Sequence, residues 1–344
     1  MDVKTETKKY YGDVLKKSSD LKTNACCSIG TIPTHIKTKL KNIHENVKNT
    51  YYGCGLVVPD CLENMNILDL GCGSGRDVYL LSQFVKETGK VIGIDMTDNQ
   101  LKIANENLDY HMEKFGYTEP NIEFKKGYIE NLHDLSFKSE IDIVVSNCVV
   151  NLCKDKEKVL NGVFNILKNG GEFYFSDVYC SKRIPQDLLN DAVLWGECLS
   201  GALYWNDFIN LAKKCGFTDP RLVKSNIITV KNKEIEEKLG DIQFYSATYR
   251  LFKMPDILEP DCEDYGQAVI YKGTIPYNKN SWSLDNHHTM ITGKVFPVCG
   301  NTWNMLEKTR FREHFEFIGN FDNHYGIFEG CGKGIPFDGE SSCC

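Results

Sequence analysis

The 344-residue sequence lacks several features that mark common classes of protein. It contains no CxxC pair, although structural zinc sites usually depend on such pairs. His287 and His288 have no cysteine close to them in the sequence, so we expect them to be surface residues. The chain also has no run of about 18 apolar residues, which excludes a typical membrane-spanning helix. Residues 1–9 lack the apolar core of a signal peptide, and we therefore expect a cytoplasmic (cytosolic) protein without a membrane partner.

Basic residues are also too few for binding to a polyanion. The chain carries 40 Lys and Arg against 47 Asp and Glu, a net charge of −7. This balance provides no broad basic face, so nucleic acid is not an expected partner. The 15 cysteines are numerous for such a chain, yet at roughly 4% they fall below the density of a disulfide scaffold. Reduced thiols are therefore expected.

The most informative segment that is present is a glycine turn in residues 67–76. An apolar strand runs directly into Gly71, Gly73 and Gly75, and a helical pattern follows. Glycine suits such a turn because a side chain would occupy ligand space or forbid the required φ angles. The GxGxG spacing departs from the GxGxxG of dinucleotide enzymes, which makes S-adenosylmethionine the leading cofactor. The alternative, in which the glycines only end a strand, is disfavoured by the complete order of strand, turn, helix, strand and acid.

Three residues near this turn are predicted to contact the cofactor. Asp69 ends the first strand, just before the turn. Asp95 ends the next strand, about 20 residues after the last glycine, where a carboxylate accepts ribose hydroxyls. Met96 follows and is placed to pack against the adenine.

Strand and helix patterns alternate along the first half of the chain, and this predicts an α/β fold with a mainly parallel, Rossmann-like sheet covered on both faces. An amphipathic helix is expected over residues 32–48. The further expected helices are 76–88, 99–115, 156–168 (ended by Gly170 and Gly171) and 205–214, and the expected strands are 66–70, 90–94, 121–125, 141–146 and 171–176.

The pattern changes along the chain in a way that predicts four units. These are an N-terminal helical segment (1–55) with Cys26 and Cys54, a cofactor-binding domain (56–200), an appended domain (201–258) and a C-terminal domain (259–344) with a cysteine-containing tail. Residues 259–265 form a candidate linker. Residues 268–273 read as a strand that opens the C-terminal unit. No coiled-coil seam is visible, and a monomer is expected.

Six motifs, four of them with a cysteine, stand out between about residue 9 and residue 254: YYGDVL (10–15), TNAC (23–26), YYGCG (51–55), SNCVVN (146–151), LWGEC (194–198) and GALYW (201–205). Together they resemble the arsenite S-adenosylmethionine methyltransferases, and the likeness is dense over this range. It implies a class I methyltransferase fold with an appended arsenic-binding unit and a small C-terminal unit. It also implies that Cys148 and Cys198 bind trivalent arsenic, with Cys26 and Cys54 as further catalytic thiols and Cys54 as a candidate third arsenic ligand.

The position of Cys148 agrees with this implied role. It follows an apolar strand at the carboxyl edge of the expected sheet, where open α/β folds bind ligands. Trivalent arsenic is soft and prefers thiolates, by the argument that pairs cysteine with soft metals. Packing as a small apolar residue is the alternative for each cysteine. That structural role is the expected one for Cys27, Cys61, Cys153, Cys180, Cys215, Cys262 and Cys299, which match no motif. Cys331, Cys343 and Cys344 could capture arsenic and pass it inward, could exchange disulfides during turnover, or could have no function.

Further cofactor contacts are implied by the same resemblance. Ile129 and Glu130 match the positions at which the family places an apolar residue against the adenine and an acid near its amino group; the alternative for Glu130 is a solvated acid. Tyr51 and Tyr52 could lay a ring near the sulfonium, a cation–π contact of about 0.5–2 kcal/mol, or form a core aromatic pair. Tyr52 is the one we assign to the cofactor.

The sequence therefore predicts transfer of a methyl group to trivalent arsenic, supplied as arsenite or as arsenic–thiol conjugates. The lone pair of arsenic would attack the methyl group, and the products would be methylarsenicals and S-adenosylhomocysteine. Because the transfer oxidises arsenic, a thiol reductant such as glutathione or thioredoxin is an expected co-substrate. Two other functions stay open: methylation of oxygen, nitrogen or carbon in a small metabolite, and sequestration of soft metals without catalysis. Antimony is a further plausible ligand.

Overall fold

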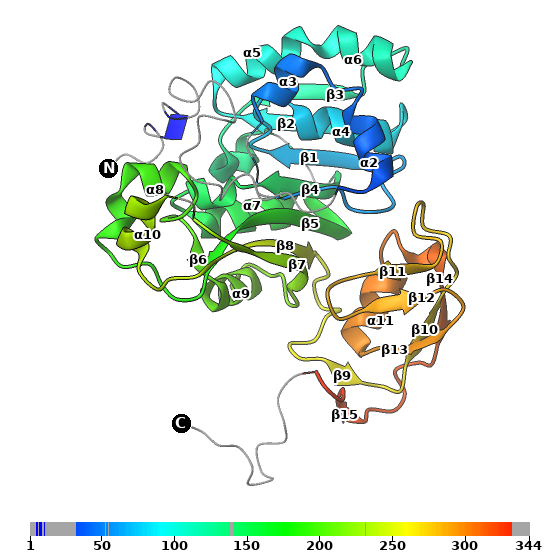
Figure 1. The fold of residues 1–344 in the computed structure, drawn as a ribbon. Coiled ribbons are helices and arrows are strands. Elements are labelled where there is room, and N and C mark those ends of the chain that lie inside the picture. Colours follow the sequence, from blue (N-terminus) through cyan, green and yellow to red (C-terminus); the bar gives the residue numbers. More distant parts are fainter. Residues whose placement is uncertain are drawn as a thin grey trace.

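The fold is centred on one eight-stranded sheet (Figure 1). The computed structural model describes residues 5, 7, 8, 10, 32–51, 53, 55–135, 137, 140–230 and 232–331. The sheet order is β3-β2-β1-β4-β5-β8-β7, and β6 also pairs with β5. Its strands are β1 (Asn66–Leu70), β2 (Lys90–Asp95), β3 (Ile122–Lys126), β4 (Ile141–Asn147), β5 (Leu167–Cys180), β6 (Leu203–Tyr204), β7 (Arg221–Ile228) and β8 (Phe244–Phe252).

The first five strands run parallel, which confirms the predicted doubly wound arrangement. β8 lies antiparallel to both β5 and β7, so residues of the expected appended unit complete the main sheet. Every strand expected from the sequence is present. β5 is longer than expected because it starts at Leu167, which pairs with Ile141 across a register shift.

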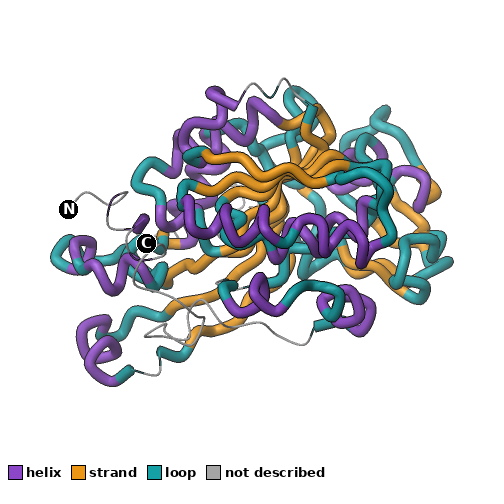
Figure 2. The backbone as a smooth tube through the Cα atoms, turned by 90° about the horizontal axis from the view of Figure 1, so that it is seen from above, coloured by secondary structure: helices purple, strands orange, loops and turns teal. Residues whose placement is uncertain are grey.

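Helices cover both faces of the strands, as Figure 2 shows. One face packs against α2 (Thr34–Leu40), α3 (Glu45–Asn49), α4 (Arg76–Val85), α5 (Asp98–Glu106) and α6 (Leu108–Phe115). The other packs against η4 (Ile129–Leu135), α7 (Lys156–Ile166) and α9 (Trp205–Lys214). Successive side chains of a strand point to opposite faces of the sheet, so β1 contributes to both cores. Ile67 packs on the face that α4 covers, and Leu68 and Leu70 pack on the face that α7 covers. In the described residues, no helix is long and apolar enough to cross a membrane.

Four helix predictions were wrong in their extent, and one of them is the helix expected over 76–88, which ends at Val85. The helix expected over 32–48 is two helices, because His44 adopts an extended backbone and its ring accepts a hydrogen bond from Asn46 N–H. The helix expected over 99–115 breaks at Asn107, whose amide donates to Ile103 O at 2.8 Å and competes with the helical pattern. The helix expected to reach residue 168 ends at Ile166, and Gly170 lies instead in the irregular start of β5 with φ +80°.

The C-terminal unit is built from short strands around α11 (Gly300–Glu307), shown in orange in Figure 1. Its strands are β9 (Glu263–Asp264), β10 (Ala268–Tyr271), β11 (Ser281–Ser283), β12 (Thr289–Ile291), β13 (Val295–Pro297), β14 (Phe315–Ile318) and β15 (Gly326–Ile327). β10 confirms the strand expected there. His287 is exposed as expected, whereas His288 is half-buried with its Nδ1 2.7 Å from Asp285, so the expectation of a surface residue was wrong for His288. The candidate linker 259–265 is ordered instead, because β9 pairs with β15 and Glu259 N–H donates to Asn301 at 2.8 Å.

A buried charged cluster joins this unit to the main sheet. Glu172 on β5 is fully buried. It forms ion pairs with Arg250 on β8, at 3.2 Å, and with Arg310 of the C-terminal unit, at 3.0 Å. Arg310 also donates to the backbone oxygen of Asp60 at 2.9 Å. Both arginines depend on one carboxylate for charge neutralisation.

We expect Glu172→Gln to lower the free energy of unfolding by about 3–5 kcal/mol, because it leaves two buried guanidinium groups without a counter-charge. Urea unfolding followed by tryptophan fluorescence would measure this loss. The matched control is Glu123→Gln, which removes the exposed pair with Lys90 at 2.8 Å and should cost less than about 1 kcal/mol. Equal effects of the two substitutions would contradict the role given to the cluster.

Candidate active site

The glycine turn lies between β1 and α4 and all three of its glycines have positive φ. The values are +70° at Gly71, +52° at Gly73 and +87° at Gly75, a region that side chains other than glycine rarely adopt. Gly71 and Gly73 line a cavity beside the turn. Gly75 does not line it; a Cβ there would come within 2.7 Å of the Phe124 ring. The third glycine therefore serves the packing of α4 against β3.

The cavity encloses about 1060 Å³ of empty space, part of it open to solvent. It lies at the carboxyl ends of β1, β2 and β4, the expected edge of an open α/β sheet. Besides the three glycines of the turn, the sequence predicts six cofactor contacts: Tyr52, Asp69, Asp95, Met96, Ile129 and Glu130. All of these except Tyr52, which is outside the described residues, line the cavity.

Asp95 is fixed by two backbone hydrogen bonds. Gly73 N–H donates to it at 2.9 Å and Thr97 N–H at 2.8 Å. Burial raises the pKa of this carboxyl, and these N–H groups act in the opposite direction. Asp69 is also buried, and its pKa is raised well above the usual value by burial and by the nearby carboxylates of Asp77 and Asp95. A cationic or hydroxyl-rich ligand would relieve this concentration of negative charge.

Tyr51 also lines the cavity and belongs to a polar cluster. The Arg76 guanidinium lies over its ring, 3.0 Å from the ring centroid. The hydroxyl oxygen of Tyr51 accepts a hydrogen bond from the Asn147 side-chain amide at 2.6 Å. Asn147 also donates to Asp77, which is ion-paired with Arg76. The cation–π partner of Tyr51 in this structure is therefore a side chain of the protein.

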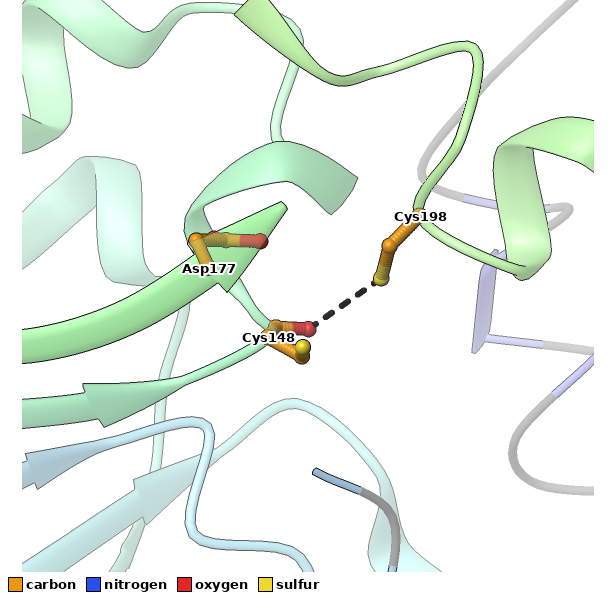
Figure 3. A group of neighbouring side chains, drawn as sticks. All are labelled: Cys148, Asp177 and Cys198. Carbon is orange, nitrogen blue, oxygen red and sulfur yellow. Dashed lines mark hydrogen bonds between the residues drawn. The ribbon is translucent and has the colours of Figure 1, made fainter. Parts of the chain in front are cut away.

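Cys148, Asp177 and Cys198 converge, as Figure 3 shows, and Cys148 also lines the cavity. Their ligand atoms all lie within 4.8 Å of one another and all three residues are buried. Cys148 follows β4, Asp177 lies on the neighbouring β5, and Cys198 comes from the loop after α8 (Ala192–Gly196). The Cys198 thiol donates to the backbone oxygen of Cys148 at 3.4 Å. Cys148 itself takes part in a disulfide bond.

Both cysteines have left-handed backbone conformations, with φ of +57° at Cys148 and +61° at Cys198. Such conformations cost about 1–3 kcal/mol for a residue other than glycine and gather at functional sites. Here they turn two cysteine side chains from separate segments toward one point. The two residues that the resemblance marks as arsenic ligands are thus placed together by the fold.

Asp177 is a site residue that the sequence analysis missed. Burial raises its pKa to about 6, against the effect of N–H groups from Val178 and Asn151. The buried Lys156, whose own pKa is lowered by burial, is the nearby cation. The signal that was available is register: Asn147 pairs with Ser176 in the sheet, which puts Asp177 next to Cys148. Asn147, Asp77, Gln100 and Thr7 also line the cavity and were not predicted.

The other cysteines have varied positions. Cys26 and Cys54 are outside the described residues. Cys153 lines the cavity although it matches no motif, and burial raises its pKa to about 12. Cys72 also borders the cavity, with its sulfur within 2.8 Å of the place where a Cβ on Gly93 would lie.

Two segments of the chain match models of known protein families. Residues 62–216 match a family model described as a methyltransferase domain, and residues 259–325 match one described as a domain of unknown function (DUF8838). The arsenite methyltransferase of Aquipseudomonas alcaligenes is 55% identical over 97% of this chain and 98% of its own length. That of Homo sapiens is 48% identical over 91% of this chain and 83% of its own length.

A solved structure gives the same relationship. The crystal structure of an arsenic(III) S-adenosylmethionine methyltransferase from Chlamydomonas reinhardtii is 44% identical, with a TM-score of 0.84 over 87% of this chain and 100% of that one. The fold, the cavity beside the glycine turn and relatives matched over nearly their whole length all agree. The chain belongs to the arsenite methyltransferase family of S-adenosylmethionine-dependent enzymes.

Proposed function

We propose that this enzyme methylates trivalent arsenic while the thiolates of Cys148 and Cys198 hold it, with arsenite or its thiol conjugates as substrate. One observation carries the proposal: Cys148 belongs both to the buried group with Asp177 and Cys198 and to the wall of the cofactor cavity. An atom bound to the Cys148 sulfur would therefore face the methyl donor. No strong general base is needed, because the nucleophile is the arsenic lone pair.

The described residues of the cavity fit S-adenosylmethionine. A Cβ on Gly73 would have no neighbour closer than 3.8 Å, so it would stand in the open cavity. Asp95 would accept the ribose hydroxyls, and Asp69 would add negative charge near a cationic ligand. Met96, Ile129 and Glu130 would hold the adenine, with Tyr52 near the sulfonium. The cofactor, when bound, supplies a methyl group on a sulfonium and leaves as S-adenosylhomocysteine.

Loading of the substrate is a ligand exchange at arsenic. Each cysteine thiol forms an As–S bond while a hydroxyl group leaves arsenic as water, or while a thiol leaves from a conjugate. Burial excludes water from the As–S bonds. Asp177, placed within 4.8 Å of both sulfurs, is positioned to accept a thiol proton. The third sulfur would come from Cys54 or from a bound thiol conjugate.

Turnover requires electrons as well as a methyl group. When the arsenic lone pair forms the As–C bond, arsenic passes formally from the trivalent to the pentavalent state. Two thiols that join as a disulfide supply the two electrons that restore trivalent arsenic. Cysteines of the site, Cys26 and Cys54 among them, or an external thiol would supply these electrons, and glutathione or thioredoxin would reduce the disulfide again. The disulfide at Cys148 supports the same requirement, since the thiolate that binds arsenic is produced only by reduction.

We expect methylarsenical formation to stop within about one turnover when no thiol reductant is added, and to continue when glutathione or a thioredoxin system is present. Purified protein would be incubated with arsenite and S-adenosylmethionine, and arsenic species would be separated by chromatography with mass detection. Sustained multiple turnover in reductant-free buffer would contradict the redox part of the proposal. Absence of methylarsenicals under both conditions, with cofactor binding intact, would contradict the proposed activity.

A further inference from the structure

Cys148 and Cys198 are 50 residues apart in the sequence, and the contact drawn between them in Figure 3 is a hydrogen bond from the Cys198 thiol to the backbone oxygen of Cys148. Arsenic would take the place of the thiol proton, so this hydrogen bond would be absent once arsenic is bound. Other contacts must then hold the two segments at a fixed spacing. We call residues 148–153 the Cys148 segment and residues 194–202 the Cys198 segment.

Asn151 links the Cys148 segment to its neighbours on both sides. It lies in η5 (Val150–Leu152) and is buried. Its backbone N–H donates to the Asp177 carboxylate at 3.0 Å, and its side-chain amide donates at 2.5 Å to the backbone oxygen of the next residue on β5. Its own backbone oxygen faces Gly201 of the Cys198 segment, where an added Cβ would overlap that oxygen. One residue therefore contacts both the strand that carries Asp177 and the segment that carries Cys198.

The ammonium group of Lys156 strengthens the same connection. Lys156 is the first residue of α7 and is buried. Its Nζ donates to the backbone oxygens of Cys153 at 2.8 Å and Asn151 at 3.4 Å. It also lies 5.6 Å from the ring centroid of Trp195, which belongs to the Cys198 segment. A buried ammonium group is costly unless hydrogen bonds replace its lost water, so these contacts hold both segments against the start of α7.

Gly201 allows the close approach of the two segments. Its φ is not positive, so its backbone conformation would accept another residue. The nearby oxygen of Asn151 is what excludes a side chain. Ala202 N–H donates to Leu199 O at 3.1 Å and closes a turn that spans Gly201 and begins directly after Cys198. A displacement at Gly201 would therefore be transmitted to Cys198.

We propose that Asn151, Lys156 and Gly201 are positioning residues that set the spacing of the Cys148 and Cys198 sulfurs for arsenic. The inference rests on the proposed function, because arsenic is the ligand that both sulfurs would bind. Groups that orient the ligands of a metal centre typically contribute about 10- to 100-fold in affinity or activity. None of the three residues lines the cofactor cavity, so they would act on arsenic and leave the binding of S-adenosylmethionine unchanged.

Gly201→Ala tests the spacing directly, because its methyl group must push the Cys198 segment away from Asn151. Reduced full-length protein would be assayed with arsenite, S-adenosylmethionine and glutathione, and kcat/KM for arsenite would be obtained from the methylarsenicals formed. This value should fall by about 10- to 100-fold. The Kd of S-adenosylmethionine, measured by isothermal titration calorimetry, should stay at the parental value. A residue that only stabilised the fold would not separate these two quantities.

Lys156→Met tests the contacts of the ammonium group. It leaves two buried backbone oxygens without their donor, and kcat/KM for arsenite should again fall by about 10- to 100-fold. Lys156→Arg should recover part of this loss, because it keeps the charge and the N–H donors. A cavity with about 250 Å³ of empty space beside Lys156 leaves room for the larger guanidinium group.

Matched controls are Gly162→Ala and Lys158→Met, which both change α7. A Cβ on Gly162 would meet its nearest neighbour at 3.4 Å, an ordinary contact, and Lys158 is exposed. Both variants should keep the parental kcat/KM for arsenite.

The inference is overturned if Gly201→Ala and Lys156→Met have parental melting temperatures and also keep the parental kcat/KM for arsenite. It is equally overturned if their affinity for S-adenosylmethionine falls by the same factor as kcat/KM. If one of the two variants does not fold, the other carries the test. Failure of the proposed function would look different, because Cys198→Ser would then form methylarsenicals at the parental rate.

Discussion

Replacement of Cys198 by serine should reduce methylarsenical formation by at least about 100-fold, beyond the 10- to 100-fold typical of groups that only support a ligand. Serine keeps the size of the side chain but replaces a soft sulfur with a hard oxygen, which trivalent arsenic binds far less well. Cys198 is fully buried and has a left-handed backbone, so its side chain is held in one position beside Cys148. Arsenic speciation by chromatography with mass detection, at saturating reductant, measures the loss.

The same substitution should leave the affinity for S-adenosylmethionine unchanged, because Cys198 does not line the cofactor cavity. Cys148→Ser should lose activity to a similar extent. Cys215→Ser is the matched control, since Cys215 is a buried free thiol at the end of α9, and it should retain full activity. If Cys198→Ser formed methylarsenicals at the parental rate, thiolate ligation by this residue would be excluded.

Replacement of Asp95 by alanine should weaken S-adenosylmethionine binding by roughly 100-fold, or about 2.7 kcal/mol. Hydrogen bonds to a charged group contribute about 1.5–3 kcal/mol each, and the proposed contacts are to two ribose hydroxyls. The carboxylate also fixes Gly73 N–H at 2.9 Å, so its loss loosens the turn that lines the cavity. Isothermal titration calorimetry with the purified variant would measure the change in dissociation constant.

Asp109→Ala is the matched control, because Asp109 is an exposed aspartate in the first turn of α6, and it should bind the cofactor as the parent does. The affinity of Asp95→Asn for S-adenosylmethionine should lie between those of Asp95→Ala and Asp109→Ala, since an amide oxygen still accepts one hydrogen bond. A melting temperature close to that of the parent would show that the variants are folded. Parental affinity in folded Asp95→Ala protein would rule out the role given to this carboxylate.

The fold was largely predictable because its signals are local. Apolar strands, glycine at Gly71 and Gly73 and an acid at Asp95 each act within a few residues, and together they set the parallel sheet and the cavity. Helix ends were less predictable: the breaks at His44 and Asn107 depend on single side chains that bond to the nearby backbone. The completion of the main sheet by β7 and β8 depends on long-range antiparallel pairing, which no local pattern records.

The candidate site also has a part that sequence motifs indicate and a part that depends on long-range strand pairing. The family motifs indicated Cys148 and Cys198, but Asp177 lies in an apolar strand and its role depends on the register between β4 and β5. Cys262 and Cys331 are widely spaced in sequence and neither belongs to a motif, so only the pairing of β9 with β15 shows that their segments lie side by side. Arg221 reaches Cys299 from β7 of the main sheet, at 3.9 Å, and could not be associated with it from the sequence.

The place of β8 in the sheet has a consequence for the growing chain on the ribosome. β5 carries Asp177 and is buried along most of its length, yet its antiparallel neighbour β8 begins about 64 residues after β5 ends. At about 5–20 residues per second, synthesis leaves this apolar strand edge unpaired for roughly 3–13 s. Unpaired apolar edges favour association between chains. The nascent chain is therefore most vulnerable to aggregation between residues 180 and 252, and a fragment that ends at residue 216 would keep that edge open permanently.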